Sequence, residues 1–162
     1  MNVKILGAFG ALALLAACST PADTTSASAA GGGGTLGGAG SSVTPGSQED
    51  LVASGNDRVF FATNASALTS DSRGKLDQQA AFLSRYPQDN VQIAGNCDER
   101  GTEEFNIALG QRRANSARDY IVARGVAGSR VTTISYGKDR PTALGSDESS
   151  WQQNRNATTS VR

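Results

Sequence analysis

Charged and amide side chains that could bind a ligand gather between residues 96 and 120, in the stretch NCDERGTEEFNIALGQRRANSARDY. Asp98 lies in an acidic loop, and Arg113 lies on the helix predicted to follow it. At about 100° per residue, Asn106 and Arg113 fall within about 60° of Leu109, near the apolar side of that helix. A guanidinium group is costly to bury unless it is paired. Asp98 is one candidate partner of Arg113, and a ligand is the other.

The placement of Arg113 is compatible with two roles. As a structural residue, it would pair with Asp98 or bind backbone carbonyl groups. As a ligand residue, its fork would hold a carboxylate through two parallel hydrogen bonds.

The helix that positions these residues is expected to begin at Thr102 or Glu103 and to continue to Gly125. The Thr102 hydroxyl can accept a hydrogen bond from an orphaned backbone N–H, and acidic residues suit the positive end of the helix dipole. Gly125 supplies the permissive backbone that ends a helix. The stripe expected to be buried consists of Phe105, Leu109, Ser116 and Tyr120.

Asp98 and Glu99 could be interpreted as a catalytic carboxylate pair for glycoside cleavage. Adjacent residues usually point apart, however, whereas that mechanism needs facing carboxylates roughly 5 to 9 Å apart. A calcium loop is disfavoured because the acids do not alternate as an EF-hand requires. We therefore expect neither a catalytic residue nor a metal site here, and a solvated position for Glu99.

The composition excludes several classes of function. The chain has 162 residues, enough for one domain with extensions, and no net charge. Interspersed acids and bases lack the clustered basic face that nucleic acids require. The absence of histidine removes Ser-His-Asp and Cys-His catalysis and the commonest zinc ligand. Cys97 is expected to be either buried and inert or exposed and oxidisable, because its acidic neighbours would raise the thiol pKa.

The N-terminus has the pattern of an export signal over residues 1–17. Lys4 precedes a short apolar segment that ends Leu-Ala-Ala before Cys18. The segment is shorter than the roughly 20 apolar residues that span a bilayer. Small residues followed by cysteine indicate a bacterial lipobox, in which Cys18 is acylated; an ordinary signal peptide with a chance cysteine is the alternative. Ser19 at the next position favours sorting to the outer membrane.

Residues 18–56 are rich in Gly, Ser, Ala and Thr, which predicts a flexible tether between the lipidated Cys18 and the folded domain. The domain is predicted at 57–162. Its expected strands are 59–62, 91–94, 131–136 and 157–161, with helices from Ser70 or Asp71 to Tyr86, at 103–125 and around 147–154. This order predicts an α/β (α+β sandwich) fold with two main helices on one face of a small mixed four-stranded sheet. The second and third strands should be parallel, the last strand should lie at an edge, and Trp151 should cover a sheet edge or the core.

The motifs DERGT, FNIALGQRRAN and SYGKDRP resemble the family of peptidoglycan-associated lipoproteins, Pal. This family belongs to the wider group of domains similar to the C-terminal domain of outer membrane protein A (OmpA). The resemblance covers roughly residues 59 to 157 and implies an OmpA-like order βαβαβ(α)β.

The resemblance also implies a binding site. In similar domains, the aspartate of the loop and the arginine before Ala-Asn hold opposite ends of diaminopimelate, the zwitterionic residue of peptidoglycan stem peptides. Those positions are Asp98 and Arg113 here. Asn106 could donate or accept, Gly101 would let the loop backbone approach closely, and Asn96 would contribute a polar group. No bond is broken in such a site.

The sequence departs from the family pattern at three places. Asn96 stands where histidine is usual, Ala62 stands where the first strand usually continues into aspartate, and Asn156 replaces an arginine of a late NRRA motif. The first change is expected to be tolerated, and the second leaves one wall of the pocket undefined.

The function that the resemblance implies is a lipid anchor in the outer membrane, with a domain in the periplasm that binds peptidoglycan. A TolB-like β-propeller is the implied protein partner, acting in envelope integrity and cell division. A wall-binding module of a stator or secretion machine and a wall hydrolase are the alternatives. The short cleavable N-terminal segment argues against a stator, which is held by a membrane-spanning helix.

Overall fold

The computed structural model describes residues 43–162, so the predictions for Cys18 and the signal segment lie outside the described residues. The helices are α1 (Gln48–Ala53), α2 (Ser70–Arg85), α3 (Glu103–Ala123) and α4 (Glu148–Asn154), with a 3₁₀ turn at Gly128–Arg130. The strands are β1 (Arg58–Phe60), β2 (Val91–Asn96), β3 (Val131–Gly137) and β4 (Asn156–Val161). No helix among these residues combines the length and apolar character needed to cross a bilayer.

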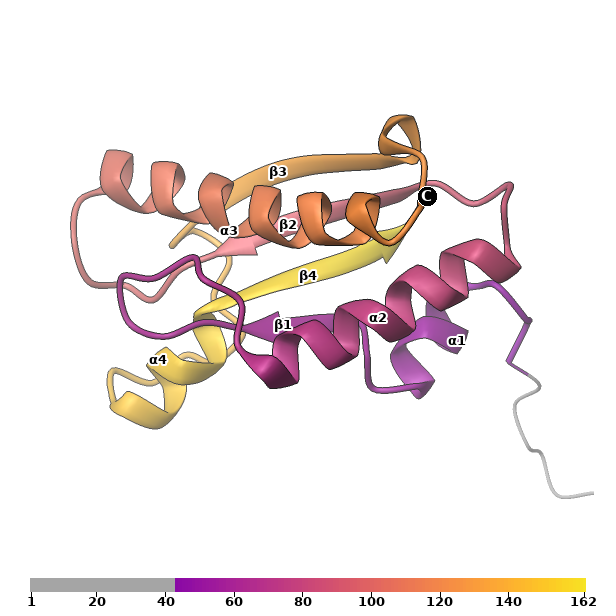
Figure 1. The fold of residues 1–162 in the computed structure, drawn as a ribbon. Helices are drawn as coiled ribbons and strands as arrows, with labels where there is room; N and C mark the ends of the chain where they lie inside the picture. Colours follow the sequence, from indigo (N-terminus) through magenta and orange to yellow (C-terminus); the bar gives the residue numbers. More distant parts are fainter. Residues whose placement is uncertain (1–42) are drawn as a thin grey trace, which may run out of the picture. The chain divides into compact units, whose positions relative to one another are not determined.

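The four strands form one mixed sheet in the order β1-β4-β2-β3. β2 and β3 are parallel, as predicted, and β4 runs antiparallel to both of its neighbours. α2 and α3 lie on the same face of the sheet (Figure 1), which confirms the predicted fold class. The core between the layers includes Val59, Leu76, Leu83, Ile93 and Ile121.

The prediction that β4 lies at an edge is wrong, because β4 pairs with β1 on one side and β2 on the other. Its polar sequence suggested an edge, but polarity follows from the face that a side chain occupies and not from the place of the strand in the sheet. Ala157 and Thr159 are buried toward the helices, and Thr158 and Ser160 lie on the opposite face, where they are partly exposed.

The folded domain begins before residue 57, the boundary that composition predicted. α1 lies inside the range assigned to the tether, and its Leu51 is only 2% exposed. Ser47 caps the helix, and the Gln48 side chain accepts a hydrogen bond of 2.7 Å from the backbone of Val161. The segment QEDLVA was misassigned because the Gly- and Ser-rich residues around it dominate the average composition.

The buried face of α3 is rotated away from the predicted stripe. Phe105 is 43% exposed, whereas the buried residues are Asn106, Leu109, Gly110, Arg113, Ala114, Ala117 and Ile121. Most of these residues are small or polar, so a prediction based on a stripe of large apolar residues does not identify them as buried. Burial of this face depends on a close approach between α3 and β2.

That close approach occurs where two glycines face each other. A Cβ atom added at Gly95 of β2 would overlap the backbone carbonyl of Gly110 in α3, and one added at Gly110 would lie 2.8 Å from the Gly95 carbonyl oxygen. Any side chain at either position would therefore push the helix off the sheet. The contact brings the first half of α3 down onto the end of β2, where the candidate site lies.

Gly110→Ala should destabilise the domain by roughly 1–3 kcal/mol, the cost of overpacking, despite the better helix propensity of alanine. Urea denaturation followed by circular dichroism measures the change. Gly74→Ala in α2 is the matched control, because nothing lies within 4 Å of a Cβ there. The control should gain about 0.5–1 kcal/mol. A Gly110→Ala protein as stable as the control would contradict the proposed close contact.

Candidate functional site

The loop between β2 and α3 ends in the predicted helix cap. The Thr102 hydroxyl oxygen accepts a hydrogen bond from the Phe105 backbone N–H at 3.2 Å, and α3 begins at Glu103. Gly101 has φ of +95°, a left-handed conformation that side chains rarely adopt. The Lys138 ammonium group donates to the Gly101 carbonyl at 3.0 Å. These contacts fix the point at which the acidic loop enters the helix.

Arg113 is the largest fully buried side chain in the described part of the chain, at 1% exposure. Its Nε donates to the Ala65 carbonyl at 2.9 Å, and its Nη2 donates to the Ala62 carbonyl at 3.1 Å. Its Nη1 donates to the Asn96 carbonyl at 2.8 Å and contacts the Cys97 Sγ at 3.4 Å. The guanidinium group therefore ties the segment after β1 to the end of β2.

Of the roles considered for Arg113, its contacts match the one that binds backbone carbonyls. Four of its five N–H groups have acceptors, which leaves one N–H on Nη2. Two parallel bonds to a carboxylate would require an existing bond to open. Burial acts to lower the pKa of Arg113, but an arginine stays charged in proteins.

Asp98 is also buried, at 7% exposure, and its cationic partners are Arg100 and Arg155 instead of Arg113. Arg100 Nη2 lies 2.6 Å from Asp98 Oδ2, and Arg155 Nη1 lies 3.4 Å from the same oxygen. Burial acts to raise the pKa of Asp98, but hydrogen bonds from the side chain and backbone of Arg100 outweigh it and lower the pKa. Asp98 is therefore a carboxylate at neutral pH.

Arg155 is a site residue that the sequence reasoning missed. Its side chain is 6% exposed, and it joins Asp98 to Glu148 of α4, whose Oε1 lies 2.7 Å from Nη2. Its Nε also donates to the Phe61 carbonyl at 3.2 Å. The available signal was its place in the late NRRA-like motif, but nothing in the sequence alone shows that this arginine reaches the loop at Asp98.

Asn106 and Cys97 make buried contacts that stabilise the loop between β2 and α3. The Asn106 amide donates to the Arg100 carbonyl at 2.9 Å, and the Cys97 thiol contacts the Asn106 carbonyl at 3.4 Å. Both residues are buried. Burial raises the pKa of Cys97, so it is a neutral thiol at neutral pH, the buried alternative of the two expected for it.

Asn96 does not join the other predicted site residues through its side chain. Its carbonyl accepts from Arg113, but its amide donates to Asn156 Oδ1 at 2.8 Å. Gly95 faces α3, and Asn96 lines a different cavity together with Gln92 and Ala94 of the same strand. Its side chain therefore lies on the face of the sheet away from the helices, and its contact with Arg113 is made by its backbone carbonyl.

Trp151 of α4 packs on the loop, and not over the core or a sheet edge as predicted. The Arg100 guanidinium carbon lies 4.1 Å from the centre of its ring, and its Nε1 donates to Glu99 Oε1 at 3.0 Å. Glu99, expected to be solvated, is exposed but has this partner. α4 therefore supports the acidic loop from outside.

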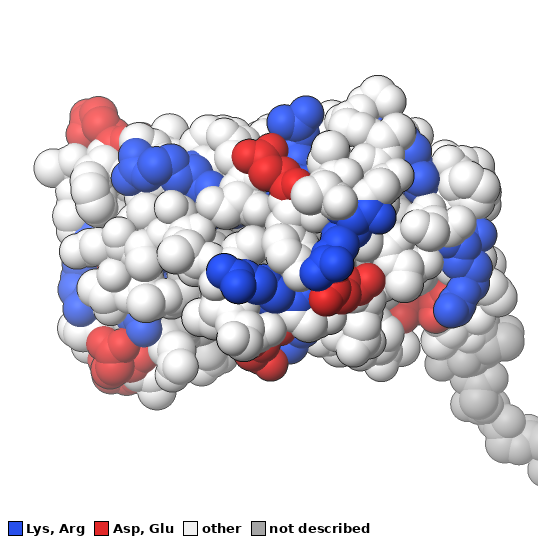
Figure 2. Space-filling view, viewed as in Figure 1, with Lys and Arg blue, Asp and Glu red and all other residues white. Residues whose placement is uncertain are grey.

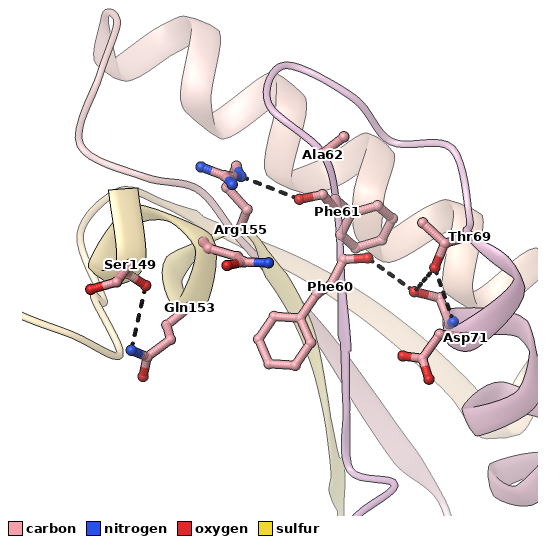
Figure 3. Close-up of a pocket in the computed structure, with 10 residues that line it drawn as sticks. Phe60, Phe61, Ala62, Thr69, Asp71, Ser149, Gln153 and Arg155 are labelled. Atoms are coloured by element: carbon pink, nitrogen blue, oxygen red, sulfur yellow. Dashed lines mark hydrogen bonds between the residues drawn. The ribbon is translucent and has the colours of Figure 1, made fainter. Parts of the chain in front are cut away.

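A cavity of about 590 Å³ lies beside this cluster. Figure 3 shows it between the end of β1, the start of α2 and helix α4, with Phe60 projecting across it. Arg155, on its wall, also contacts Asp98. Ala62 lies at the same cavity and offers no acidic side chain, so its contribution to Arg113 is its backbone carbonyl.

On the face that carries α2 and α3, Lys and Arg are interspersed with Asp and Glu, with no extended area of one sign (Figure 2). That face therefore presents no broad electrostatic field of one sign.

Comparison with known proteins identifies the family. The OmpA family model matches residues 60–155. A peptidoglycan-associated lipoprotein of Rhizobium meliloti (strain 1021) is 49% identical over 124 residues, which cover 76% of this chain and 70% of the relative. One from Pasteurella multocida (strain Pm70) is 39% identical over 95% of this chain and 94% of its own length. The chain belongs to the OmpA family, among the peptidoglycan-associated lipoproteins.

Solved structures of the family agree with this fold. The crystal structure of the peptidoglycan-associated lipoprotein from Burkholderia pseudomallei is 40% identical, covers 65% of this chain and 90% of its own, and has a TM-score of 0.64. The C-terminal domain of Helicobacter pylori MotB superposes with a TM-score of 0.61 at 18% identity, over 65% of this chain and 84% of its own. At that identity, the likeness to MotB shows the OmpA-family fold alone.

Asp98 should make the stability of this OmpA-family domain depend on pH. Its pKa is lower in the folded state, so its contribution is fully present above the unfolded pKa of about 3.9 and is lost as pH falls through the folded value. Asp98→Asn should therefore be less stable than the parent at pH 7, with a shallower decline below about pH 5. Urea denaturation at several pH values measures both slopes. Parallel curves that do not converge in acid would refute this role.

Proposed function

We propose that this chain is a non-enzymatic lipoprotein of the outer membrane whose domain binds peptidoglycan stem peptides in the periplasm. The relatives reported above carry the name peptidoglycan-associated lipoprotein, which supports the ligand class. The buried, neutral Cys97 thiol and the pairing of Asp98 with two arginines support a binding site in preference to a catalytic one.

The observation that carries the proposal is that an acidic and a basic side chain lie near each other where the loop enters α3, while their direct partners are other groups. Asp98 is an ionised acceptor, and Arg113 is a fixed donor anchored to three backbone carbonyls. Diaminopimelate carries an ammonium and a carboxylate at the end of its side chain, so it presents both complementary groups. In the proposed complex, Asp98 accepts from the ammonium group and Arg113 donates to the carboxylate.

Arg100 is the cation that the ligand ammonium would replace. Its side chain is 39% exposed, whereas the Asp98 side chain is 9% exposed. Swinging Arg100 into water costs little because its charge is already partly solvated. Arg155, at 6% exposure, stays in place and keeps Asp98 oriented.

In its present arrangement, the Arg113 guanidinium group has one N–H left for the ligand carboxylate. The two parallel hydrogen bonds expected from the sequence are therefore not part of this proposal. Backbone N–H groups of the loop opened by Gly101 can supply further donors, and Asn106 fixes that loop. The cavity at Phe60 and Ala62 offers room for the adjoining part of the stem peptide.

Asp98→Asn should abolish co-sedimentation of the purified domain with diaminopimelate-type sacculi, because the isosteric amide has no charge to pair with an ammonium group. Glu99→Gln is the matched control: it removes the neighbouring charge and preserves an acceptor for Trp151. The control should pellet like the parent, and no soluble muropeptides should be released. Equal pelleting of both variants would overturn the site, and release of muropeptides would indicate an enzyme.

A second experiment tests which stem peptide the site recognises. Stem peptides with lysine in place of diaminopimelate lack the carboxylate that Arg113 would hold, so they should bind at least tenfold more weakly in a calorimetric titration, the loss of about one charge-assisted hydrogen bond. Equal binding would show that the pair does not recognise a two-ended ligand.

The membrane anchor in this proposal is Cys18, which lies outside the described residues. Its place after Leu-Ala-Ala supports acylation, and several acyl chains hold a protein firmly where one is marginal. Residues between the anchor and α1 would let the domain reach the wall.

Cys18→Ser should release the protein from outer-membrane fractions into the soluble periplasmic fraction, because the serine hydroxyl does not accept the thioether-linked lipid. Sucrose-gradient fractionation with detection of the domain measures this, and metabolic labelling with an alkyne fatty acid should fail in the variant. Cys97→Ser is the control, since that thiol is buried in the domain. Continued membrane association of Cys18→Ser would show that another element anchors the chain.

The protein partner that we propose is a TolB-like periplasmic β-propeller, and its support is membership of this family alone. A wall-bound domain on a lipid anchor would pull the outer membrane inward at division if such a partner moved it between the wall and the inner membrane.

A further inference from the structure

We propose that the uncovered face of the sheet carries a binding groove for an oxyanion that also bears a hydroxyl group. The groove is a cavity of about 330 Å³, on the side of the sheet away from α2 and α3. All four strands contribute to its lining, together with the segment after β3. It is distinct from the site at Asp98 and does not depend on the function proposed there.

The charged side chains that line the groove are all basic. Its lining includes Arg58, Arg140 and Arg162 and contains no aspartate or glutamate. Among residues 43–162, no carboxylate lies within ion-pair distance of Arg58 or Arg140. A concave lining with unpaired guanidinium groups favours an anionic occupant.

Two buried polar atoms in the groove have no partner. In the described part of the chain, three buried side-chain atoms lack a hydrogen bond, and two of them, Arg58 Nε and Asn96 Oδ1, belong to residues that line this cavity. Buried polar groups are nearly always satisfied by protein or ordered water, so these two atoms are free to bind water or a ligand in the groove. Arg58 offers a donor and Asn96 offers an acceptor, which together fit a group that both accepts and donates.

The orientation of the Asn96 amide is fixed by its hydrogen bond to Asn156. Its Nδ2 donates to Asn156 Oδ1, which also accepts from the Thr158 hydroxyl. Rotating the Asn96 amide would place its oxygen against that acceptor. Asn96 is only 7% exposed, so its Oδ1 is an acceptor available to a donor that enters the groove.

The arginines are held so that N–H groups stay available. The Arg140 guanidinium stacks on Tyr136, with 3.7 Å between its carbon and the ring centre, and stacking leaves the edge of the guanidinium plane open. Arg58 Nη1 has only a long 3.4 Å bond to the Thr142 hydroxyl. Phosphate and hydroxylated carboxylates are the ligand class that matches these donors and the Asn96 acceptor.

Inorganic phosphate is the first probe, because it carries both oxyanion oxygens and an O–H near neutral pH. Titration of the folded domain, followed by amide chemical shifts, should give saturable shifts in β1, β4 and the end of β2. Arg58→Gln should weaken this binding on the order of tenfold, the loss of a charged hydrogen bond. Arg140→Gln should also weaken it, and the two together should abolish it.

Arg85→Gln is the matched control, since Arg85 lies on α2 and is exposed on the helical layer. It removes the same charge and should leave phosphate affinity unchanged. The Arg58 and Arg140 variants should still pellet with sacculi, which separates this proposal from the one at Asp98. Shifts that never saturate would mean that phosphate has no specific site in the groove. That result, or equal weakening by Arg85→Gln, would overturn the proposal.

Two further ligands distinguish the source of the oxyanion. N-acetylmuramic acid presents the carboxylate and hydroxyl groups of a wall glycan from which the stem peptide has been removed, and glycerol 3-phosphate presents the headgroup chemistry of a phospholipid. Stronger binding of one of them, with the same loss in Arg58→Gln, would assign the groove to wall or to lipid. Failure of both to compete with bound phosphate would contradict a hydroxylated oxyanion as the occupant.

Discussion

The buried guanidinium group of Arg113 is the constraint on which the rest of the site depends. A charge at 1% exposure must be compensated, and here backbone carbonyls of Ala62, Ala65 and Asn96 do so, in place of a carboxylate. These carbonyls come from two segments that the sequence separates widely. One side chain therefore sets the distance between the end of β1 and the end of β2, and it leaves Asp98 free to pair with other cations.

That separation of partners gives the Asp98 carboxylate one buried and one exposed cationic partner. Arg155 holds Asp98 from the buried side, whereas Arg100 holds it from the solvent side and rests on Trp151. An exposed cation can leave at small cost, and a buried one cannot. The site is thus preorganised on one side and exchangeable on the other, an arrangement suited to reversible capture of a cationic group.

Local signals in the sequence were sufficient for local structure. The cap at Thr102, the glycine turn at Gly101 and the parallel pairing of β2 with β3 follow from residue type, spacing and chain direction, and each is present. Contacts between distant segments were not predictable in this way. The central place of β4 and the reach of Arg155 to Asp98 depend on which strands pair, and no single segment encodes that choice.

Two asparagines that depart from the family pattern give a second example of a contact between distant segments that the sequence does not predict. Asn96 and Asn156 are far apart in the chain, and each looks like an isolated loss, of a histidine and of an arginine. In the sheet they are neighbours joined by a 2.8 Å hydrogen bond, so the two changes form one buried polar unit. Their joint effect falls on the open face of the sheet, while Arg113 still donates a hydrogen bond to the Asn96 carbonyl. A departure in side chain therefore leaves the Arg113 site intact and changes the opposite face, because a strand presents its backbone to one partner and its side chains to another.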